Sequence, residues 1–464
     1  MRLSALLTPD ALVAGADPEA VEIAALTADS RKVEPGALFA ALEGGRTDGR
    51  AFVGDALQRG AVAVLAAGPV AEAAGRAVLV VDPDPRQRLA RMAARFFGRQ
   101  PRRVVAVTGT NGKTTVASLV AQMWRHAGQP AASLGTLGID AGEWQEAGAL
   151  TTPDPVELHR CLSRLASRGI DHLALEASSH GLEQRRLDGV EFAAAAFTNL
   201  SRDHLDYHGD EDTYFRAKAR LFDTLLEPGH MAVLPRDRPE FDRLSEVCRR
   251  RGIEVCDYGR TARRIRLTGQ RAEGQAQRLD LAIDGERHTV RLQMAGDFQA
   301  ENLMAALGLV LATGTSASAA LAAVDRLRAP PGRMQEVART ADGAPIVVDY
   351  AHTPEALQRV LAALRPTTEG RLIVVFGCGG DRDPGKRRLM GTVAAAGADR
   401  VIITDDNPRT EDPKAIRRAV LAAVPEALDI GDRRAAIRRA VEGLKAGDTL
   451  LIAGKGHERV QIVG

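Results

Sequence analysis

A glycine-rich segment near residue 110 has a lysine and a hydroxyl side chain at the spacing that phosphate binding needs. Residues 104–115 read VVAVTGTNGKTT, an apolar run that predicts a strand, followed by Gly112, Lys113 and Thr114. Backbone N–H groups of a tight glycine loop and of a helix N-terminus bind phosphate oxygens, Lys113 adds a positive charge, and the Thr114 hydroxyl can reach Mg²⁺. We therefore predict a nucleotide phosphate loop between a strand and a helix.

The segment departs from the common phosphate-loop pattern. That pattern has a glycine where this chain has Val107, and the first glycine here, Gly109, lies closer to Gly112. A Gly-Lys-Thr match alone is a weak signal, and a structural glycine turn is the alternative. The strand before the loop and the helix after it favour the nucleotide site.

The elements that position this loop alternate between strand and helix. The first hundred residues predict strands at 37–42, 62–66 and 77–81, then an arginine-rich helix at 86–97 and a linker at 98–101. From residue 103 the alternation continues, which predicts a mostly parallel sheet with helices on both faces.

Polar segments follow two of the central strands. The predicted strand 172–175 leads into Glu176, and the predicted strand 193–197 leads into a segment that contains His204. Ligands of open α/β sheets bind outside the carboxyl ends of the strands, so we expect these segments to meet the phosphate loop.

The last part of the chain predicts a second doubly wound unit. Alternating apolar and polar residues at 257–294 predict a small antiparallel insertion with a structural role, and a helix near 302–313 precedes a linker at 329–332. Later strands are expected at 346–349, 372–376, 400–404 and 449–453. We predict an α/β fold with three domains, namely an N-terminal domain 1–99, a central phosphate-loop domain with a parallel sheet at 100–330, and a C-terminal Rossmann-like doubly wound domain at 331–464.

Composition excludes several classes of function. The 464 residues are 45% hydrophobic and 26% charged, which suits a protein of two to four globular domains. A net charge of +2 argues against a nucleic-acid surface, and the sequence has neither a long apolar run nor a signal-peptide pattern. We expect a cytoplasmic enzyme without membrane insertion. The four cysteines fit no zinc spacing, and we expect buried thiols.

A series of motifs extends beyond the phosphate loop in a fixed order. The motifs, each with its first residue, are SR (Ser30), TTPDP (Thr151), LEASSHGLEQRR (Leu175), FTNLSRDHLDYHG (Phe197), YFRAKARLF (Tyr214), GRM (Gly332), DYAHTPEAL (Asp349), FGCGGDRDPGKR (Phe376), TDDNPRTEDP (Thr404) and GKGHE (Gly454). Together with TGTNGKTT, they resemble the Mur ligases and their relative folylpolyglutamate synthase. These enzymes join an amino acid to a carboxylate at the expense of ATP.

Within this family, the resemblance implies a ligase that acts on a UDP-muramyl dipeptide. The expected reaction adds meso-2,6-diaminopimelate to the D-glutamate of UDP-N-acetylmuramoyl-L-alanyl-D-glutamate, through an acyl phosphate, in cytoplasmic peptidoglycan precursor synthesis. ATP and Mg²⁺ are the implied cofactors. Small molecules are the expected partners, nucleic acid is not, and we expect a monomer.

The resemblance also implies an ATP site and a metal site. The implied ATP-binding residues are Gly109, Thr110, Asn111, Gly112, Lys113, Thr114, Thr115, Asn302, Arg333, Asp349 and His352. Thr114, Glu176 and His204 are hard or borderline ligands that suit Mg²⁺. A lysine in a helix is most often a surface residue, but the resemblance implies that Lys218 is carbamylated by CO₂ and faces the metal as an anion. Carbamylation needs the neutral amine, so the surroundings of Lys218 must favour the modified form. The implied catalytic residues are Lys113, Glu176, His204 and Lys218.

Two further sets of residues are implied for the other substrates. The set for the UDP substrate is Ala28, Ser30, Thr151, Thr152, Ser178, Gln184 and Arg186, and the set for diaminopimelate is Arg382, Asp406, Asn407, Pro408, Arg409, Gly454 and Glu458. Singly, such serines and threonines are turn or cap residues, and the DNPR sequence could be an Asx turn. Arg409 and Arg382 can pair with the distal carboxylate of diaminopimelate, and Glu458 can accept its ammonium.

Lysine usage supports these assignments. The chain has seven lysines and fifty-five arginines, so arginine serves wherever a generic cation is enough. Four of the lysines, Lys113, Lys218, Lys386 and Lys455, lie in the motifs, as expected where guanidinium cannot replace an ammonium or amine. The alternative is that a few lysines simply persist anywhere.

The sequence departs from the family pattern at several positions. Pro235 and Gln299 stand where asparagine is common, and Leu150 stands where a polar residue is frequent. We expect changed details of the nucleotide contacts within the same class. The sequence given ends at Gly464, where relatives continue, so we expect that either the copy is shortened or part of the last domain is missing.

Three other functions are possible. The chain could be an L-lysine-adding ligase, which the DNPR sequence disfavours, or a folylpolyglutamate-type ligase, which Thr151 and Thr152 with LEASSHGLEQ disfavour. It could also be a non-catalytic nucleotide-binding homologue. The presence of Lys113, Glu176, His204 and Lys218 argues against that last function.

Overall fold

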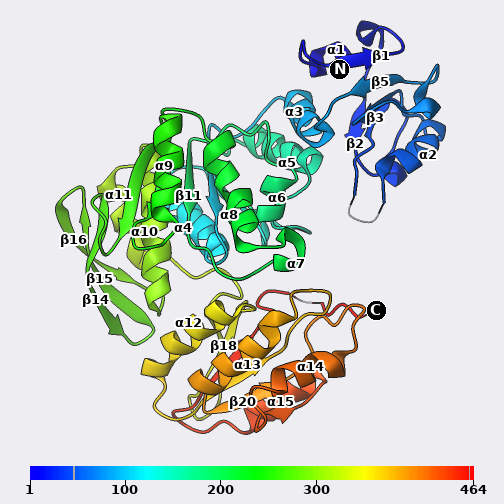
Figure 1. Ribbon diagram of the computed structural model, residues 1–464. Helices are drawn as coiled ribbons and strands as arrows, with labels where there is room; N and C mark the ends of the chain where they lie inside the picture. The colour runs from blue at the N-terminus through cyan, green and yellow to red at the C-terminus, as the bar shows by residue number, and fades with distance from the viewer. Residues whose placement is uncertain (45–46, 459, 464) are drawn as a thin grey trace.

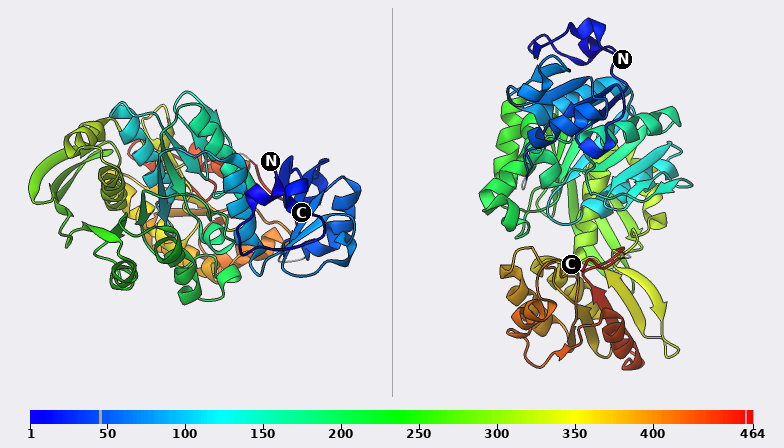
Figure 2. Two further views of the ribbon diagram at one scale, coloured as in Figure 1. Left: turned by 90° about the horizontal axis from the view of Figure 1, so that it is seen from above. Right: turned by 90° about the vertical axis from the view of Figure 1, so that its right-hand side faces the viewer.

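The computed structural model describes residues 1–44, 47–458 and 460–463 and arranges their strands in three sheets (Figure 1). The sheets follow one another along the chain, and Figure 2 shows the central unit between the N-terminal and C-terminal units. The α/β fold class predicted from the sequence is confirmed.

The N-terminal sheet has the strand order β1-β5-β4-β3-β2, with all neighbours parallel except β1 and β5. Strands β3 and β4 are buried along their whole length, because α2 covers one face of the sheet and α3 the other. The elements are α1 (Leu3–Leu6), β1 (Leu12–Ala14), η1 (Pro18–Ala20), β2 (Ala25–Thr27), η2 (Ser30–Lys32), β3 (Ala37–Ala40), η3 (Gly49–Phe52), α2 (Val53–Gln58), β4 (Ala63–Ala66), η4 (Ala71–Ala73), β5 (Val78–Val81) and α3 (Pro85–Phe97).

The central sheet has the strand order β16-β15-β14-β13-β12-β11-β6-β10-β7-β8-β9, and neighbours from β14 to β7 run parallel. Its strands are β6 (Arg103–Thr108), β7 (Ala131–Gly135), β8 (Gly138–Asp140), β9 (Gln145–Glu146), β10 (His172–Glu176), β11 (Ala194–Phe197), β12 (Met231–Pro235), β13 (Glu254–Gly259), β14 (Ile265–Glu273), β15 (Ala276–Ile283) and β16 (Glu286–Leu292). Its helices are α4 (Lys113–His126), α5 (Pro155–Ser167), α6 (Ser179–Glu183), α7 (Leu205–His208), α8 (Glu211–Arg220), the π-helix η5 (Leu221–Leu225), α9 (Phe241–Arg251), α10 (Asp297–Ala312), α11 (Ala317–Ala323) and η6 (Val324–Arg326). Helices therefore cover both faces, as the alternation predicted.

Strands β14, β15 and β16 have the antiparallel pairing predicted for residues 257–294, and they extend the central sheet, which the sequence did not predict. Strand β13 pairs with β14 in parallel at Tyr258 and Gly259. The apolar positions Leu279, Leu281 and Leu292 belong to the same core cluster as α4 and α10. The strands join the sheet because their apolar face has α10 to pack against.

In the part of the chain that the structure describes, no helix has both the length and the apolar surface that crossing a membrane requires.

The C-terminal sheet has the strand order β17-β18-β22-β19-β20-β21, and only β17 is antiparallel to its neighbour. The elements are β17 (Gln335–Arg339), β18 (Pro345–Asp349), α12 (Pro354–Leu364), η7 (Arg365–Thr367), β19 (Leu372–Phe376), α13 (Gly385–Gly397), β20 (Arg400–Ile403), α14 (Pro413–Leu421), β21 (Leu428–Asp429), α15 (Arg433–Glu442) and β22 (Thr449–Ala453). Helices α12, α13 and α14 cover one face and α15 the other. This doubly wound arrangement brings the loops after β18, β19, β20 and β22 to one edge.

Asp188 joins the N-terminal and central units. Its carboxylate accepts two hydrogen bonds from Arg220 at 2.8 and 2.7 Å and a third from Gln87 on α3 at 2.8 Å. The side chains of Asp188 and Arg220 are only 3% and 9% exposed. The pair therefore connects α8, which contains Lys218, to the N-terminal unit.

Replacing Asp188 with alanine is expected to lower the free energy of unfolding by about 3–5 kcal/mol, because Arg220 would stay buried without its counter-charge. Urea-induced unfolding followed by circular dichroism measures the change. The matched control is Asp171→Ala, which removes an exposed partner 3.7 Å from Arg102 and should cost about 1 kcal/mol or less. Equal losses for the two variants would contradict this account.

Charged pairs join the central and C-terminal units. Arg202 donates to Asp383 at 2.8 Å, and the imidazole Nε2 of His352 lies 3.5 Å from a carboxylate oxygen of Asp203. Phe298, on α10 of the central unit, packs against the apolar core of the C-terminal unit. The two units thus meet around the segment that follows β11.

Candidate active site

The phosphate loop connects β6 to α4, as the sequence predicted. Gly109 and Gly112 have backbone φ angles of +140° and +89°, which a residue with a side chain rarely adopts. A Cβ atom on Gly109 would lie 1.9 Å from the hydroxyl of Thr198, so a larger residue could not fit. The glycines therefore let the loop turn tightly against the segment after β11.

That segment fixes the loop through hydrogen bonds. The backbone N–H groups of Thr110 and Asn111 donate to Asn199, one to its carbonyl oxygen at 2.8 Å and the other to its side-chain oxygen at 3.0 Å. The hydroxyl of Thr198 donates to the carbonyl of Asn111 at 2.6 Å. The expected meeting of these two segments is confirmed.

Lys113, at the end of the phosphate loop, and Lys218, on α8, both bond to the backbone of this loop. The ammonium of each donates to the carbonyl oxygen of Gly109 at 2.9 Å, and Lys113 also donates to the carbonyl of Thr110 at 2.8 Å. Burial lowers the pKa of both lysines, and the charge of Lys113 lowers the pKa of Lys218 further. Burial and the charge of Lys113 thus both act against the charged form of the Lys218 amine.

Glu176 lies at the end of β10 beside the start of α4. Its carboxylate accepts hydrogen bonds from the hydroxyl of Thr114 at 3.0 Å and from the backbone N–H of Thr136 at 2.8 Å. Arg333, from the C-terminal unit, donates to the hydroxyl of Thr114 at 3.0 Å. Glu176 is 2% exposed, and it forms no ion pair among the described residues. A buried carboxylate of this kind can accept a cation.

His204 begins α7 with a left-handed backbone, φ +54°. Its Nε2 lies 3.4 Å from the carboxylate of Asp203, which His352 also approaches. Burial lowers the pKa of His204 to about 3, so its imidazole is neutral near pH 7 and can donate a lone pair to a metal. Burial raises the pKa of Asp203, but the hydrogen bond with His352 and the positive charges nearby together outweigh this and keep the pKa below its ordinary value.

The predicted metal ligands provide donors that suit a hard cation. No cluster of three or more His, Cys, Asp or Glu side chains is positioned for a metal ion among the described residues. Glu176, His204 and the Thr114 hydroxyl would therefore hold Mg²⁺ only together with other oxygen ligands, such as phosphates or a carbamate on Lys218. The donor types fit the ion.

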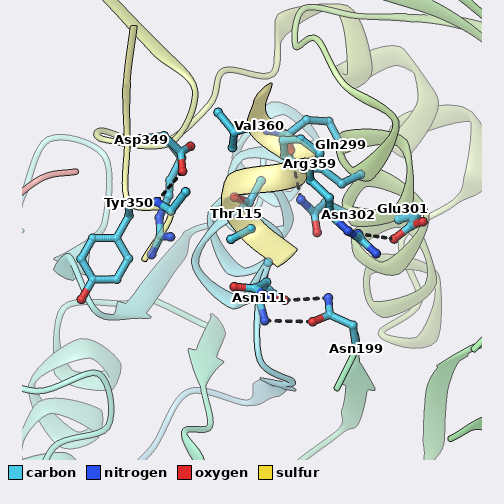
Figure 3. Close-up of a pocket in the computed structure, with 15 residues that line it drawn as sticks. Asn111, Thr115, Asn199, Gln299, Glu301, Asn302, Asp349, Tyr350, Arg359 and Val360 are labelled. Carbon is cyan, nitrogen blue, oxygen red and sulfur yellow. Dashed lines mark hydrogen bonds and ion pairs between the residues drawn. The ribbon is translucent and has the colours of Figure 1, made fainter. Parts of the chain in front are cut away.

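A pocket between the central and C-terminal units lies next to the phosphate loop (Figure 3). Its empty volume is about 580 Å³, which includes space open to solvent. The lining residues are Asn111, Gly112, Thr115, Asn199, Phe298, Gln299, Glu301, Asn302, Arg333, Asp349, Tyr350, Ala351, Ala356, Arg359 and Val360. The predicted residues Asn302, Arg333 and Asp349 thus meet the phosphate loop, whereas His352 does not line the pocket and instead lies beside Asp203.

Four of the residues predicted for the UDP substrate, Thr152, Ser178, Gln184 and Arg186, form one connected group in the central unit. The hydroxyl of Thr152 accepts from the backbone N–H of Ser178 at 3.0 Å, and the guanidinium of Arg186 donates to the carbonyl of Thr152 at 2.7 Å and to the side-chain oxygen of Gln184 at 2.7 Å. Thr151 shares a 3.0 Å hydrogen bond with Thr136. Ala28 lies just before η2 and Ser30 is its first residue, both in the N-terminal unit, and among the described residues neither forms a hydrogen bond or ion pair with this group.

The DNPR loop follows β20 and packs against the loop after β19. Arg409, with φ +52°, donates to the carbonyl of Gly380 at 2.7 Å, and a Cβ atom on Gly380 would lie 1.9 Å from the carbonyl oxygen of Pro408. Arg382 is 45% exposed and lies 3.8 Å from Asp206 of the central unit. A Cβ atom on Gly379 would lie close to both Arg409 and Arg382, so these side chains are neighbours.

Asn407 and Glu458 both accept hydrogen bonds from Lys455, a buried lysine that lies in a sequence motif but had no predicted role. The ammonium of Lys455 donates to the side-chain oxygen of Asn407 at 2.9 Å and to the carboxylate of Glu458 at 2.8 Å. The amide nitrogen of Asn407 donates to Glu458 at 3.1 Å. Glu458, which was expected to accept the ammonium of the substrate, therefore already has an ammonium partner within the chain.

Comparison with known proteins gives the family. Family models match three successive regions, which are described as the Mur ligase family catalytic domain (residues 22–97), the Mur ligase middle domain (107–310) and the Mur ligase glutamate ligase domain (332–456). Relatives from Mesorhizobium japonicum and Brucella melitensis are 52% and 53% identical, and each match covers 96% of this chain and 92% or 91% of the relative. The chain belongs to the Mur ligase family. Both relatives are named UDP-N-acetylmuramoyl-L-alanyl-D-glutamate–2,6-diaminopimelate ligase.

A solved structure of a Mur ligase with the same name has a similar fold. It matches with a TM-score of 0.72 and 36% identity, over 100% of this chain and 95% of that protein. The family resemblance and the fold class predicted from the motifs are thus both confirmed.

Several residues of this Mur ligase site were not predicted. Asn199 holds the phosphate loop, Phe298 lines the pocket, and Glu301 lies beside Arg359, which donates to it at 3.2 Å (Figure 3). Arg333 stacks over the ring of Tyr350 at 4.5 Å. Asn199 and Tyr350 belong to sequence motifs, which was a usable signal. Glu301 and Arg359 belong to no quoted motif, so the sequence offered no signal for them.

Proposed function

We propose that this Mur ligase adds meso-2,6-diaminopimelate to the D-glutamate of UDP-N-acetylmuramoyl-L-alanyl-D-glutamate, with conversion of ATP to ADP and phosphate. The main support is the near full-length similarity to relatives that bear the name of this reaction. The phosphate loop, the pocket beside it and the DNPR loop agree with it. We expect the reaction to take place in the cytoplasm, with the protein acting as a monomer.

The first step is phosphoryl transfer. The γ-carboxylate of D-glutamate attacks the γ-phosphorus of ATP, the bond from that phosphorus to the bridging oxygen breaks, and ADP leaves. The backbone N–H groups of loop residues 112–115 would hold the phosphates, because those of Thr110 and Asn111 already donate to Asn199, and Lys113 would stabilise the negative charge that develops. Thr114, Glu176 and His204 would contribute to holding Mg²⁺, which would supply positive charge to the phosphates.

The second step is amide formation. The amine at the L-centre of diaminopimelate attacks the acyl carbon of the acyl phosphate, a proton leaves the amine, and inorganic phosphate departs. The C-terminal unit is proposed to bind the amino acid, because Arg409 and Arg382 lie on loops at the edge of its sheet that faces the central unit. No nucleophilic side chain of the protein is needed.

Lys218 is proposed to act as a carbamate. The reaction joins the neutral amine to CO₂ and releases a proton, so a buried amine with a lowered pKa favours it. An anion at this position would also pair with Lys113, which shares the Gly109 carbonyl. The repulsion between two buried ammonium groups would then become an attraction.

The nucleotide and the UDP substrate are proposed to occupy neighbouring sites. The pocket lined by Asn302, Phe298 and Arg333 suits the adenosine part of ATP, because it combines apolar walls with a few polar groups. Thr152, Ser178, Gln184 and Arg186 suit the muramyl dipeptide. Ala28 and Ser30 suit its uridine end, in the proposed N-terminal domain.

The experiment that tests this function is an assay of ADP release. Purified enzyme is given ATP, Mg²⁺ and the muramyl dipeptide with meso-diaminopimelate, with L-lysine, or with no amino acid, and a folate substrate with glutamate forms a further arm. We expect rapid release only with meso-diaminopimelate. Preference for L-lysine or for folate would replace the proposed substrate, and no release in any arm would indicate a non-catalytic homologue.

Arg409→Ala is expected to lower kcat/KM for meso-diaminopimelate. The ratio of kcat/KM for meso-diaminopimelate to kcat/KM for L-lysine should fall by about two to four powers of ten. L-lysine lacks the distal carboxylate, so in the wild type its binding would cover the half-buried guanidinium of Arg409 without giving it an anion, which costs about 3–5 kcal/mol. Steady-state kinetics with both amino acids measures the ratio, and the Michaelis constant for ATP should change little.

The control for this variant is Arg388→Ala, which removes an exposed arginine from α13 of the same unit. It should keep the preference of the wild type. If Arg409→Ala also keeps that preference, Arg409 is only a loop residue.

A further inference from the structure

Arg433 has an unused hydrogen-bond donor in the C-terminal unit. It is the first residue of α15, and its Nη2 donates to the carbonyl of Ala453, the last residue of β22, at 2.8 Å. Its Nη1 is buried, and among the described residues it has no hydrogen-bond partner. Buried polar groups nearly always have partners, so this donor requires an explanation.

The charged neighbours of Arg433 are the two carboxylates of the proposed amino-acid site. The charges of Asp406 and Glu458 act on its guanidinium, but neither carboxylate lies within ion-pair distance of it. Glu458 is already paired with Lys455 at 2.8 Å, and Asp406 accepts from the backbone N–H of Asn407 at 2.7 Å. Among the described residues, the free Nη1 therefore has no carboxylate to bind.

Gly454, which follows Ala453, lets the backbone after β22 pass close to Asp406. A Cβ atom on Gly454 would lie 3.0 Å from a carboxylate oxygen of Asp406, and the residue has φ +106°. Arg433 reaches the start of this glycine segment through the Ala453 carbonyl. Arg433, Asp406 and Gly454 thus surround one small region at the carboxyl edge of the sheet.

A purely structural role explains only half of this arrangement. Holding the Ala453 carbonyl uses one donor of Arg433 and leaves the other donor buried and unpaired, which costs free energy. An anion at Nη1 would remove that cost and would balance the charge of the guanidinium. A carboxylate matches the planar geometry of guanidinium best.

We propose that Arg433 is a further binding residue for the incoming amino acid and that its Nη1 donates to the distal carboxylate of diaminopimelate. This inference rests on the proposed function. Arg433 lies beside Asp406, the first residue of the DNPR loop, which is the loop proposed to bind the distal end. Arg409 and Arg433 would then approach the same carboxylate from two loops.

The test compares Arg433→Met and Arg433→Lys with Arg434→Met, a matched control at the exposed neighbouring position of α15. We expect kcat/KM for meso-diaminopimelate to fall about tenfold to a hundredfold in Arg433→Met, chiefly through KM, because a charge-assisted hydrogen bond is lost. Arg433→Lys should stay several-fold impaired, because it keeps the charge but not the planar donors. The control and the KM values for ATP and the muramyl dipeptide should not change.

L-lysine separates ligand binding from a structural role. Because it lacks the distal carboxylate, its kcat/KM, or its inhibition constant against diaminopimelate if it is not turned over, should be unaffected by Arg433→Met. An equal loss for both amino acids, or a loss in the KM for ATP, would show that Arg433 only supports the fold. Unchanged KM values for diaminopimelate would show that Nη1 binds water.

Two checks keep this result separate from the proposed function. If the wild type does not use meso-diaminopimelate, the proposed function fails before any variant is compared. If the wild type uses it and Arg433→Lys retains full efficiency, only the present inference fails. Should Arg433→Met not fold, as judged by circular dichroism, Arg433→Lys provides the test, because it keeps a cation at this position.

Discussion

Lys113→Ala is expected to abolish ligation, with turnover reduced more than about a hundredfold. The ammonium of Lys113 lies within the phosphate loop, bonded to the carbonyls of Gly109 and Thr110. Loss of a preorganised charge at phosphoryl transfer costs at least about 3 kcal/mol in the activation free energy. ADP release at saturating substrates measures the effect.

Lys414→Ala, which removes an exposed lysine from α14, is the control and should be fully active. Lys113→Arg should also be strongly impaired, because a guanidinium is too large for the buried site between two loop carbonyls. Circular dichroism shows whether each variant is folded. Unchanged turnover in Lys113→Ala would rule out the nucleotide assignment.

Lys218→Ala is expected to be nearly inactive, and small carboxylic acids are expected to restore part of its activity. Lys218 is 1% exposed, and burial together with the charge of Lys113 lowers the pKa of its amine. The neutral amine can add CO₂, and the resulting anion would face the metal and Lys113. Acetate or formate could take the place of that anion once the side chain is removed.

Carbon-13 NMR with labelled CO₂ tests the modification directly. The wild type in the presence of Mg²⁺ and nucleotide should show a carbamate resonance, and Lys218→Ala should lack it. The same acids should not restore Lys113→Ala, which lacks a cation rather than an anion. A bare amine at Lys218 in the Mg²⁺- and nucleotide-bound enzyme would overturn the assignment.

The fold could be predicted from the sequence wherever local pattern determines the outcome. The apolar run 104–107, the glycines at 109 and 112 and the helix after them are a local unit, and the structure has the strand β6, the loop and α4 there. Strand ends differ by one or two residues from the prediction. Burial of both faces of parallel strands produces continuous apolar runs, which are easy to recognise.

The position of strands β14, β15 and β16 could not be predicted in the same way. Their alternating pattern indicated antiparallel pairing, which the structure has. Whether their apolar face packs on itself or on another element depends on α10, which lies later in the chain. The pattern of one segment contains no information about that partner.

The motifs by themselves determined the family and the classes of residue in the candidate site, because phosphate and metal binding need particular atoms at fixed local spacing. Only the tertiary structure decided how distant residues combine. It brought Lys218 to the carbonyl of Gly109 and His352 to Asp203, and it paired Glu458 with Lys455 while leaving a donor of Arg433 free. These contacts depend on which strand ends meet at one edge of a sheet and on how two units pack, and both are set by burial summed over the whole chain.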